Sequence, residues 1–220
     1  MKGMIYSQYY VTKNMLILYL IFALLAGIFF TVLGNEDSAN FVAIIIIAFT
    51  VTAPTDNLKN EAAANWYKYA ITMPVTRKQI VLGHYAYYFI TVGLGLVVAL
   101  VIFAVRLMIG MNNLTQVIAA LFIGISISFL LSLLYPFTYA VGSDKSNLIQ
   151  MVITVLLVVI YIAFNVVTLL IGGMIYGTGE AAMHHAVFEI SRTFLFLIFS
   201  FLIAPVSYTH LRAHETGRNI

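Results

Sequence analysis

The stretch FITVGLGLVVALVIFAV, residues 89–105, contains no charged side chain and one polar one, Thr91. A helix needs about 20 apolar residues to cross the hydrocarbon core of a bilayer. The run extends in both directions, so residues 79–106 are predicted to form a spanning helix long enough to project beyond the membrane. Its apolar residues are continuous rather than alternating, which favours a helix over a strand of a membrane β-barrel.

The rest of the chain has the same character. Of its 220 residues, 62% are hydrophobic and 9% are charged, and the mean hydropathy is +1.00. Soluble domains carry about 25% charged residues, so the composition predicts an all-α integral membrane protein. Residues 1–205 are predicted to form one transmembrane domain with six spans, at 15–33, 40–58, 79–106, 114–135, 147–171 and 187–205.

The segment VSYTHLRAHETGRNI, residues 206–220, differs from every other part of the chain in its polar composition. Its first residues match the translation of a transposon-type sequencing adapter. We therefore expect residues 206–220 to be a non-native, adapter-derived tail, and we assign its side chains no function.

The distribution of charge predicts the orientation. Lys and Arg are concentrated in one set of connections, and such residues favour the cytoplasmic side. The N-terminus is therefore predicted to be cytoplasmic. The net charge of +3 is small and scattered, which argues against a nucleic-acid partner. The chain has no cysteine, so thiolate metal sites are excluded. The basic residues of the inner set are Lys2, Lys13, Lys59, Lys68, Arg77, Lys78 and Lys145.

Few polar residues lie within the predicted spans. Ser128 and Ser132 are one helical turn apart, Asn165 lies in the fifth span and His84 in the third. Polar groups in a bilayer must face protein or water. One interpretation is hydrogen bonding between helices, and the other is a translocation path lined by Ser128, Ser132 and Asn165. Arg106, at the end of the third span, is expected to extend to the outer interface.

Several kinds of enzymatic site find no support in the sequence. No G-x-x-x-x-G-K-[ST] motif is present, so the chain is not expected to bind ATP through a P-loop, and H-E-x-x-H is also missing. The cluster HHAVFE at 184–189 offers His185 and Glu189 four residues apart, but a catalytic zinc needs three protein ligands. We expect a solvated loop there. No catalytic, cofactor or metal residues are predicted.

The stretch NEAAANWYKYAITMPVTRKQI, residues 60–80, interrupts the apolar runs. At helical spacing, Ala62, Trp66, Tyr69 and Met73 form one apolar stripe, which predicts an amphipathic helix over residues 61–73 with Asn60 as its N-cap. Pro74 is expected to end this helix. The sequence then fits a capping box for the next span, with Thr76 as the cap and Gln79 at the third helical position.

Two interpretations of this helix remain open on pattern alone. It lies in the membrane interface with Trp66 as an anchor, or it docks onto a partner protein. Trp and Tyr side chains at this spacing suit a groove in a partner.

The block E…NWYKYAITMPVTRKQIVLGHY resembles the small six-span branch of ABC-2 type transporter permeases, which includes membrane subunits of exporters of phenol-soluble modulin peptides. Tyr67 departs from the pattern, because an acidic residue is usual there. MKGMI, residues 1–5, and GSDKSN, residues 142–147, are also similar to the family's opening and to its second inner loop. The matching residues of the block are Glu61, Trp66, Lys68, Tyr69, Pro74, Val75, Thr76, Arg77 and Lys78.

The resemblance implies a permease subunit of an exporter in a bacterial cell membrane. The connection between spans two and three would be a cytoplasmic coupling helix resting on a separate ABC ATPase, which binds the ATP and magnesium. A second permease copy or a sister permease completes the complex, and the substrate is an amphipathic peptide, antibiotic or lipid. The residues implied to contact the ATPase are Glu61, Trp66, Tyr67, Lys68, Tyr69, Arg77, Asp144 and Lys145.

Two other functions are alternatives to this one. An ATPase-independent secondary transporter often shows internal repeats, and no convincing repeat relates residues 1–110 to 111–205. An intramembrane hydrolase needs a buried set of catalytic groups, which the spans do not show. An ATPase gene beside this one would favour the exporter.

Overall fold

Seven helices make up the part of the chain that the computed structural model describes, which is residues 2–35, 38–64, 76–141, 145–179, 182 and 185–216. No strand occurs in these ranges. Six stretches of the described residues are long and apolar enough to cross a membrane, which confirms the predicted fold class. The helices are α1 (Lys2–Val32), α2 (Ala39–Ala63), α4 (Arg77–Met108), α5 (Leu114–Leu131), α6 (Leu134–Val141), α7 (Ser146–Tyr176) and α9 (Ala186–Thr216).

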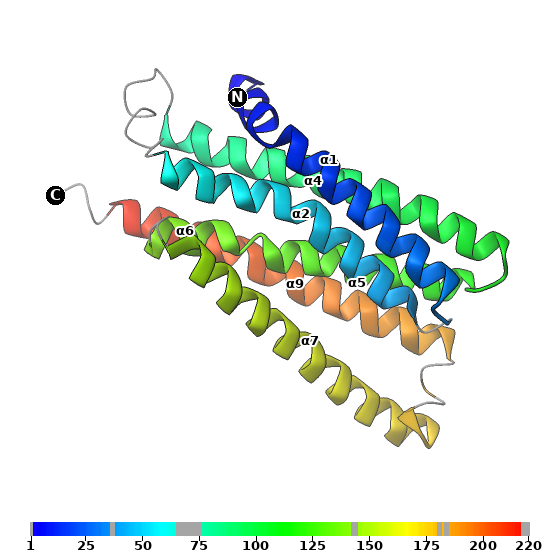
Figure 1. Cartoon of the computed structure of the whole chain (residues 1–220). Coiled ribbons are helices and arrows are strands. Elements are labelled where there is room, and N and C mark those ends of the chain that lie inside the picture. Colours follow the sequence, from blue (N-terminus) through cyan, green and yellow to red (C-terminus); the bar gives the residue numbers. More distant parts are fainter. Residues whose placement is uncertain are drawn as a thin grey trace.

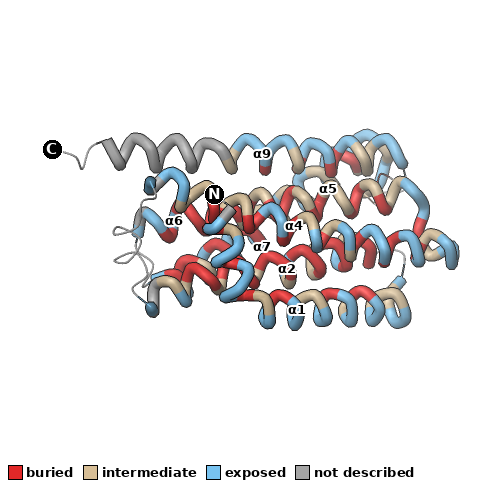
Figure 2. The backbone as a smooth tube through the Cα atoms, turned by 90° about the horizontal axis from the view of Figure 1, so that it is seen from above, coloured by how far each residue is buried: buried red, intermediate tan, exposed pale blue. Residues whose placement is uncertain are grey.

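Helix α2 lies at the centre of the bundle. It packs along α1, α4 and α5, and α5 in turn packs along α9. Figure 2 shows buried residues running along α2 and along the faces of its neighbours. Small residues let these helices approach closely, as is common in membranes. An added Cβ at Gly95 of α4 would lie 2.3 Å from the Thr50 hydroxyl of α2.

Helix α7 packs against the others only sparsely. Figure 1 shows α7 diverging from α5 and α9 towards its C-terminal end. Most of its large apolar side chains are exposed, among them Met151 at 70% and Met174 at 86%. Such a surface suits lipid tails or another membrane subunit rather than water.

The fourth predicted span is broken, which corrects the expectation of one helix over 114–135. Helix α5 ends at Leu131 and α6 begins at Leu134. Pro136 explains the position of the break, because its ring clashes with the carbonyl four residues earlier, at Ser132, and it has no N–H to donate there. The chain therefore crosses the membrane as two consecutive helices over Leu114–Tyr139.

Helix α4 begins as the sequence predicts. The Thr76 hydroxyl accepts a hydrogen bond from the backbone N–H of Gln79, and the Gln79 side chain accepts one from the Thr76 N–H. This reciprocal pair is a capping box. The beginning of α4 is thereby fixed at Arg77, beside the region that the resemblance assigns to a partner.

Arg106, which is expected to extend to the outer interface, lies among the connections at one end of the bundle. Its side chain is fully buried. The guanidinium donates to the carbonyl oxygens of Phe30 and Asn35, each at 2.9 Å, and to Ser38 Oγ and Asn112 Oδ1 at 3.0 and 2.6 Å. Phe30 lies in the last turn of α1, where the negative end of the helix dipole attracts a cation. Arg106 thus joins the end of α4 to the connection between α1 and α2.

Candidate functional site

Three helices meet through polar side chains at one end of the bundle. His84 of α4 places Nε2 2.9 Å and 3.1 Å from the two carboxylate oxygens of Glu61 on α2. The other ring nitrogen, Nδ1, lies 2.5 Å from the hydroxyl of Tyr139 on α6. These distances fit a ring whose Nε2–H donates to the carboxylate and whose Nδ1 accepts from the Tyr139 hydroxyl. The three residues form one chain across α2, α4 and α6.

The local sequence explains why these side chains converge. Asn57 and Glu61 are one turn apart on α2, and the Asn57 amide donates to Glu61 Oε1 at 3.0 Å. Tyr135 and Tyr139 are one turn apart on α6, and the Tyr135 ring stacks on His84 at 6.2 Å between centroids. His84 is buried, whereas the Glu61 side chain keeps 19% exposure. The break before α6 places both tyrosines on a helix of their own.

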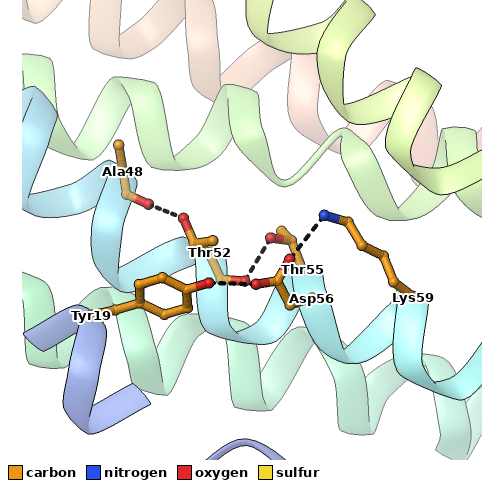
Figure 3. A network of polar contacts seen from close by, with 6 residues as sticks. All are labelled: Tyr19, Ala48, Thr52, Thr55, Asp56 and Lys59. Carbon is orange, nitrogen blue, oxygen red and sulfur yellow. Dashed lines mark hydrogen bonds and ion pairs between the residues drawn. The ribbon is translucent and has the colours of Figure 1, made fainter. Parts of the chain in front are cut away.

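A second polar group ties the same end of α2 to α1. Figure 3 shows Tyr19 of α1 donating to Asp56 at 2.6 Å, while Lys59 forms an ion pair with the same carboxylate at 2.9 Å. The hydroxyl of Thr55 donates to a carbonyl of its own helix. The C-terminal part of α2 is therefore held to α1 through Asp56 and to α4 and α6 through Glu61.

The structure places the predicted contact residues unevenly. Glu61 belongs to α2, which continues through Asn60 to Ala63, so the prediction of Asn60 as the N-cap of a new helix is wrong. The N–H of Ala64 still donates to the Asn60 carbonyl, at 3.0 Å. The helix persists because nothing in the sequence there stops it: Asn60 accepts a position inside a helix at a modest cost in propensity. The carboxylate of Glu61 faces His84 instead of lying on the surface of a separate helix.

The structure describes only some of the other residues predicted to contact an ATPase. Residues Trp66, Tyr67, Lys68, Tyr69 and Asp144 lie outside the described residues, and so does most of the amphipathic helix predicted for 61–73. Arg77 is the first residue of α4, and its backbone alone is described. Lys145 is exposed and precedes α7 without a side-chain capping bond. Their contacts with an ATPase stay predictions.

The described ends of these segments nevertheless share one location. The end of α2, the beginning of α4, the end of α6 and the beginning of α7 all lie at the same end of the bundle (Figure 1). The two connections that the sequence assigns to one side of the membrane therefore depart from one end of the protein. Glu61, His84 and Tyr139 lie just inside that end.

The residues predicted to line a translocation path form hydrogen bonds with different groups. Ser128 and Ser132 are buried, and each hydroxyl donates to a carbonyl of its own helix, at 2.7 and 2.6 Å. Bonds of this kind within a helix replace the interhelical bonds expected of these serines. Asn165 instead accepts a hydrogen bond from Arg192 of α9 at 2.9 Å. A role in lining a path stays a prediction for all three.

Sequence reasoning missed the partners of His84 because they are remote along the chain. Glu61 lies 23 residues before it and Tyr139 lies 55 residues after it. The available signal was a histidine inside an apolar run, which requires a polar neighbour in a membrane. No group of three or more His, Cys, Asp or Glu that could hold a metal ion occurs within the described ranges.

Comparison with protein families gives one match, to the family described as ABC-2 family transporter protein, over residues 3–210. The match covers all six spans and the connections between them. Comparisons with curated proteins and with solved structures gave no match.

Proposed function

We propose, from the premise that this chain belongs to the ABC-2 transporter family, that it is a membrane permease subunit driven by a separate cytoplasmic ABC ATPase. It exports an amphipathic substrate, such as a peptide, an antibiotic or a lipid-like compound. The sequence carries no P-loop motif, so the energy comes from another chain. The working complex contains two permease subunits, either two copies of this chain or this chain with a sister permease.

The observation that carries the proposal is the link from Glu61 through His84 to Tyr139. Glu61 lies in the last turn of α2, and His84 lies two turns into α4. The segment between these helices is the one that resembles a coupling helix. A force applied to that segment moves the end of α2 or the beginning of α4, and the hydrogen bonds transmit the movement to α6.

The break before α6 allows this short helix to move when α2 and α4 move. The break between α5 and α6 separates a short terminal helix from the rest of the span. Rigid-body movement about a few residues at the end of an element is a common hinge. We propose that α6 moves with α2 and α4 when the ATPase closes, and that the movement opens the transport path.

Docking is tested by co-purification. Replacing Trp66→Ala together with Tyr69→Ala removes the two aromatic anchors of the proposed coupling helix, and the partner ABC ATPase should no longer co-purify with the permease. Phe29→Ala with Phe41→Ala is the matched control, because these exposed aromatic residues lie at the opposite end of the bundle. Retention of the ATPase by the Trp66 and Tyr69 variant would refute docking at this helix.

Transmission is tested with the same preparation. Tyr139→Phe removes only the hydroxyl that meets His84, so the complex should still form while substrate-stimulated ATP hydrolysis falls severalfold. Tyr10→Phe removes a hydroxyl from an exposed tyrosine and should leave hydrolysis unchanged. Equal stimulation in Tyr139→Phe and in the wild type would show that the link carries no movement.

A further inference from the structure

Arg192 of α9 lies within a membrane-spanning helix and is 5% exposed. One nitrogen, Nη1, donates to the Asn165 side-chain oxygen of α7 at 2.9 Å. The Nε–H is buried and has no partner among the described residues. A buried donor left without a partner costs about 1–3 kcal/mol, and more when it is charged. This arginine therefore keeps hydrogen-bonding capacity that the described protein does not use.

The charge of Arg192 is also incompletely balanced. No carboxylate of the described residues lies within ion-pair distance of its guanidinium. Glu189, one turn earlier on α9, attracts it from farther away. The amide of Asn165 accepts a hydrogen bond but carries no charge. Ionisable residues inside membrane spans are costly, and they mark substrate or ion sites by default.

A small cavity adjoins this arginine. Its volume is ≈ 10 Å³, which is room for about one water molecule or one ligand oxygen. The polar side chains beside the cavity are hydrogen-bonded within their own helices. Asn165 Nδ2 donates to the Tyr161 carbonyl, and the Thr193 hydroxyl donates to carbonyls of α9. The lining residues are Ile123, Tyr161, Phe164, Asn165, Arg192 and Thr193, with Phe196 closing the group.

The surroundings of the cavity suit a ligand with an apolar chain. Beside the cavity the rings of Tyr161 and Phe164 of α7 pack on Phe196 of α9, so an apolar chain would lie on the outer side of these two helices. Ile162 and Val166 of α7 and Leu195 of α9 are more than half exposed and lie within one turn of Asn165 or Arg192 along their helices. An acyl chain can lie along these side chains while one headgroup oxygen enters the cavity.

We propose that Arg192, held by Asn165, binds an oxygen of an anionic headgroup, phosphate or carboxylate, that belongs to an amphiphile lying against the exposed apolar side chains of α7 and α9. A carboxylate or phosphate oxygen supplies both the missing acceptor and the opposite charge. A water molecule would supply only the acceptor. The site lies in the part of the bundle near the connection from α7 to α9, at the end opposite to Glu61 and His84 (Figure 1).

This inference deepens the proposed function by giving the exported amphiphile a negative charge, and it rests on that function only for the role of the ligand as cargo. Binding is measured on the full-length permease in nanodiscs without an ATPase. A permease that binds the anion but never binds an ATPase would refute the proposed function and leave the site intact. Loss of the site would leave ATPase docking intact.

The experiment measures binding of radiolabelled dodecyl phosphate to the permease in phosphatidylcholine nanodiscs. Arg192→Gln should weaken binding at least tenfold, because it removes the charge. Lys78→Gln is the control for net charge, since Lys78 is exposed at the far end of α4, and it should bind as the wild type does. Dodecyltrimethylammonium, with the same chain and the opposite charge, should not compete.

A second variant keeps the test decisive if Arg192→Gln does not fold. Asn165→Asp places a carboxylate where the amide oxygen now meets Arg192, so the two pair and the anion should bind at least tenfold more weakly. Equal binding of dodecyl phosphate to the wild type and to a folded Arg192→Gln or Asn165→Asp variant would overturn the proposal, as would full competition by the cationic probe.

The bilayer composition identifies the source of the headgroup. If phosphatidylglycerol nanodiscs suppress binding of dodecyl phosphate to the wild type but not its residual binding to Arg192→Gln, the site holds an anionic lipid of the bilayer. If the wild type binds dodecyl phosphate equally well in both bilayers, the site selects a free amphiphile. Either result requires the Arg192-dependent component that the proposal predicts.

Discussion

Arg106 is a buried arginine that joins three segments at one end of the bundle. The fully buried guanidinium of Arg106 donates four hydrogen bonds. Their acceptors lie at the end of α1, in the connection to α2 and in the turn after α4. Replacing Arg106 with Met of comparable length removes all four hydrogen bonds, including those that join α4 to α1 and to the connection after α1. We expect Arg106→Met to lower the free energy of unfolding by about 3 kcal/mol or more.

The measurement is unfolding of the purified permease in mixed micelles with increasing SDS. Lys78→Met is the control, because it also replaces a cationic side chain with Met, at an exposed position of the same helix. Arg106→Lys should fall between the two, since an ammonium reaches fewer of the acceptors. Unfolding of Arg106→Met at the SDS concentration of the wild type would contradict the structural role.

Some side-chain partners in this protein could be predicted from the sequence and others could not. The sequence identified His84 and Asn165 as polar residues in spans, but it could not identify Glu61 or Arg192 as their partners. Each pair joins two different helices, over 23 and 27 residues respectively, and periodicity describes one helix at a time. The capping box at Thr76 was predictable because both of its residues lie within one turn.

At the scale of the elements, the contact between α2 and α4 depends on a glycine. An added Cβ at Gly95 would lie 2.3 Å from Thr50 Oγ1 and 3.1 Å from Thr50 Cβ. Thr50 is fully buried and its branched side chain has little rotamer freedom. We expect Gly95→Ala to destabilise the protein by about 1–3 kcal/mol through overpacking, measured by the same SDS unfolding.

Gly93, two residues earlier on α4, provides the matched control. A Cβ there would meet nothing within 4 Å. Because Ala is the better helix former by about 1 kcal/mol in exposed helix interiors, Gly93→Ala should be neutral or slightly stabilising. If both substitutions have the same effect, close packing at Gly95 does not hold α2 against α4.

The elements themselves were predictable to different degrees. The six spans followed from apolar runs, since length and hydropathy are properties of a segment and need no knowledge of its neighbours. The break before α6 was missed although Pro136 signals it, because the apolar run continues through the break. Asn60 was wrongly taken as a cap, because a residue that suits a helix start is also tolerated inside a helix.

At the scale of the molecule, polar contacts gather at the two ends of the bundle. Glu61, His84 and Tyr139 join three helices at one end, and Arg106 joins the connections at the other. Between them the helices pack through apolar and small side chains. Helix α7 is the exception, since it is the most exposed of the six spans. This arrangement leaves α7 available to lipid, substrate or a second permease subunit.

The orientation of this bundle can be tested directly, because the chain has no cysteine and every introduced one is unique. The charge distribution predicts that Lys78 and Lys145 face the cytoplasm, and that Leu114 and Thr178, at the opposite end of the bundle, face outward. All four positions are exposed. A membrane-impermeant maleimide applied to intact cells should therefore label Leu114→Cys and Thr178→Cys, and should label Lys78→Cys and Lys145→Cys only after permeabilisation.

Labelling of the two lysine positions alone would invert the orientation and move the proposed ATPase contacts outside the cell. Labelling of Lys78→Cys without Lys145→Cys would contradict the even number of crossings between them.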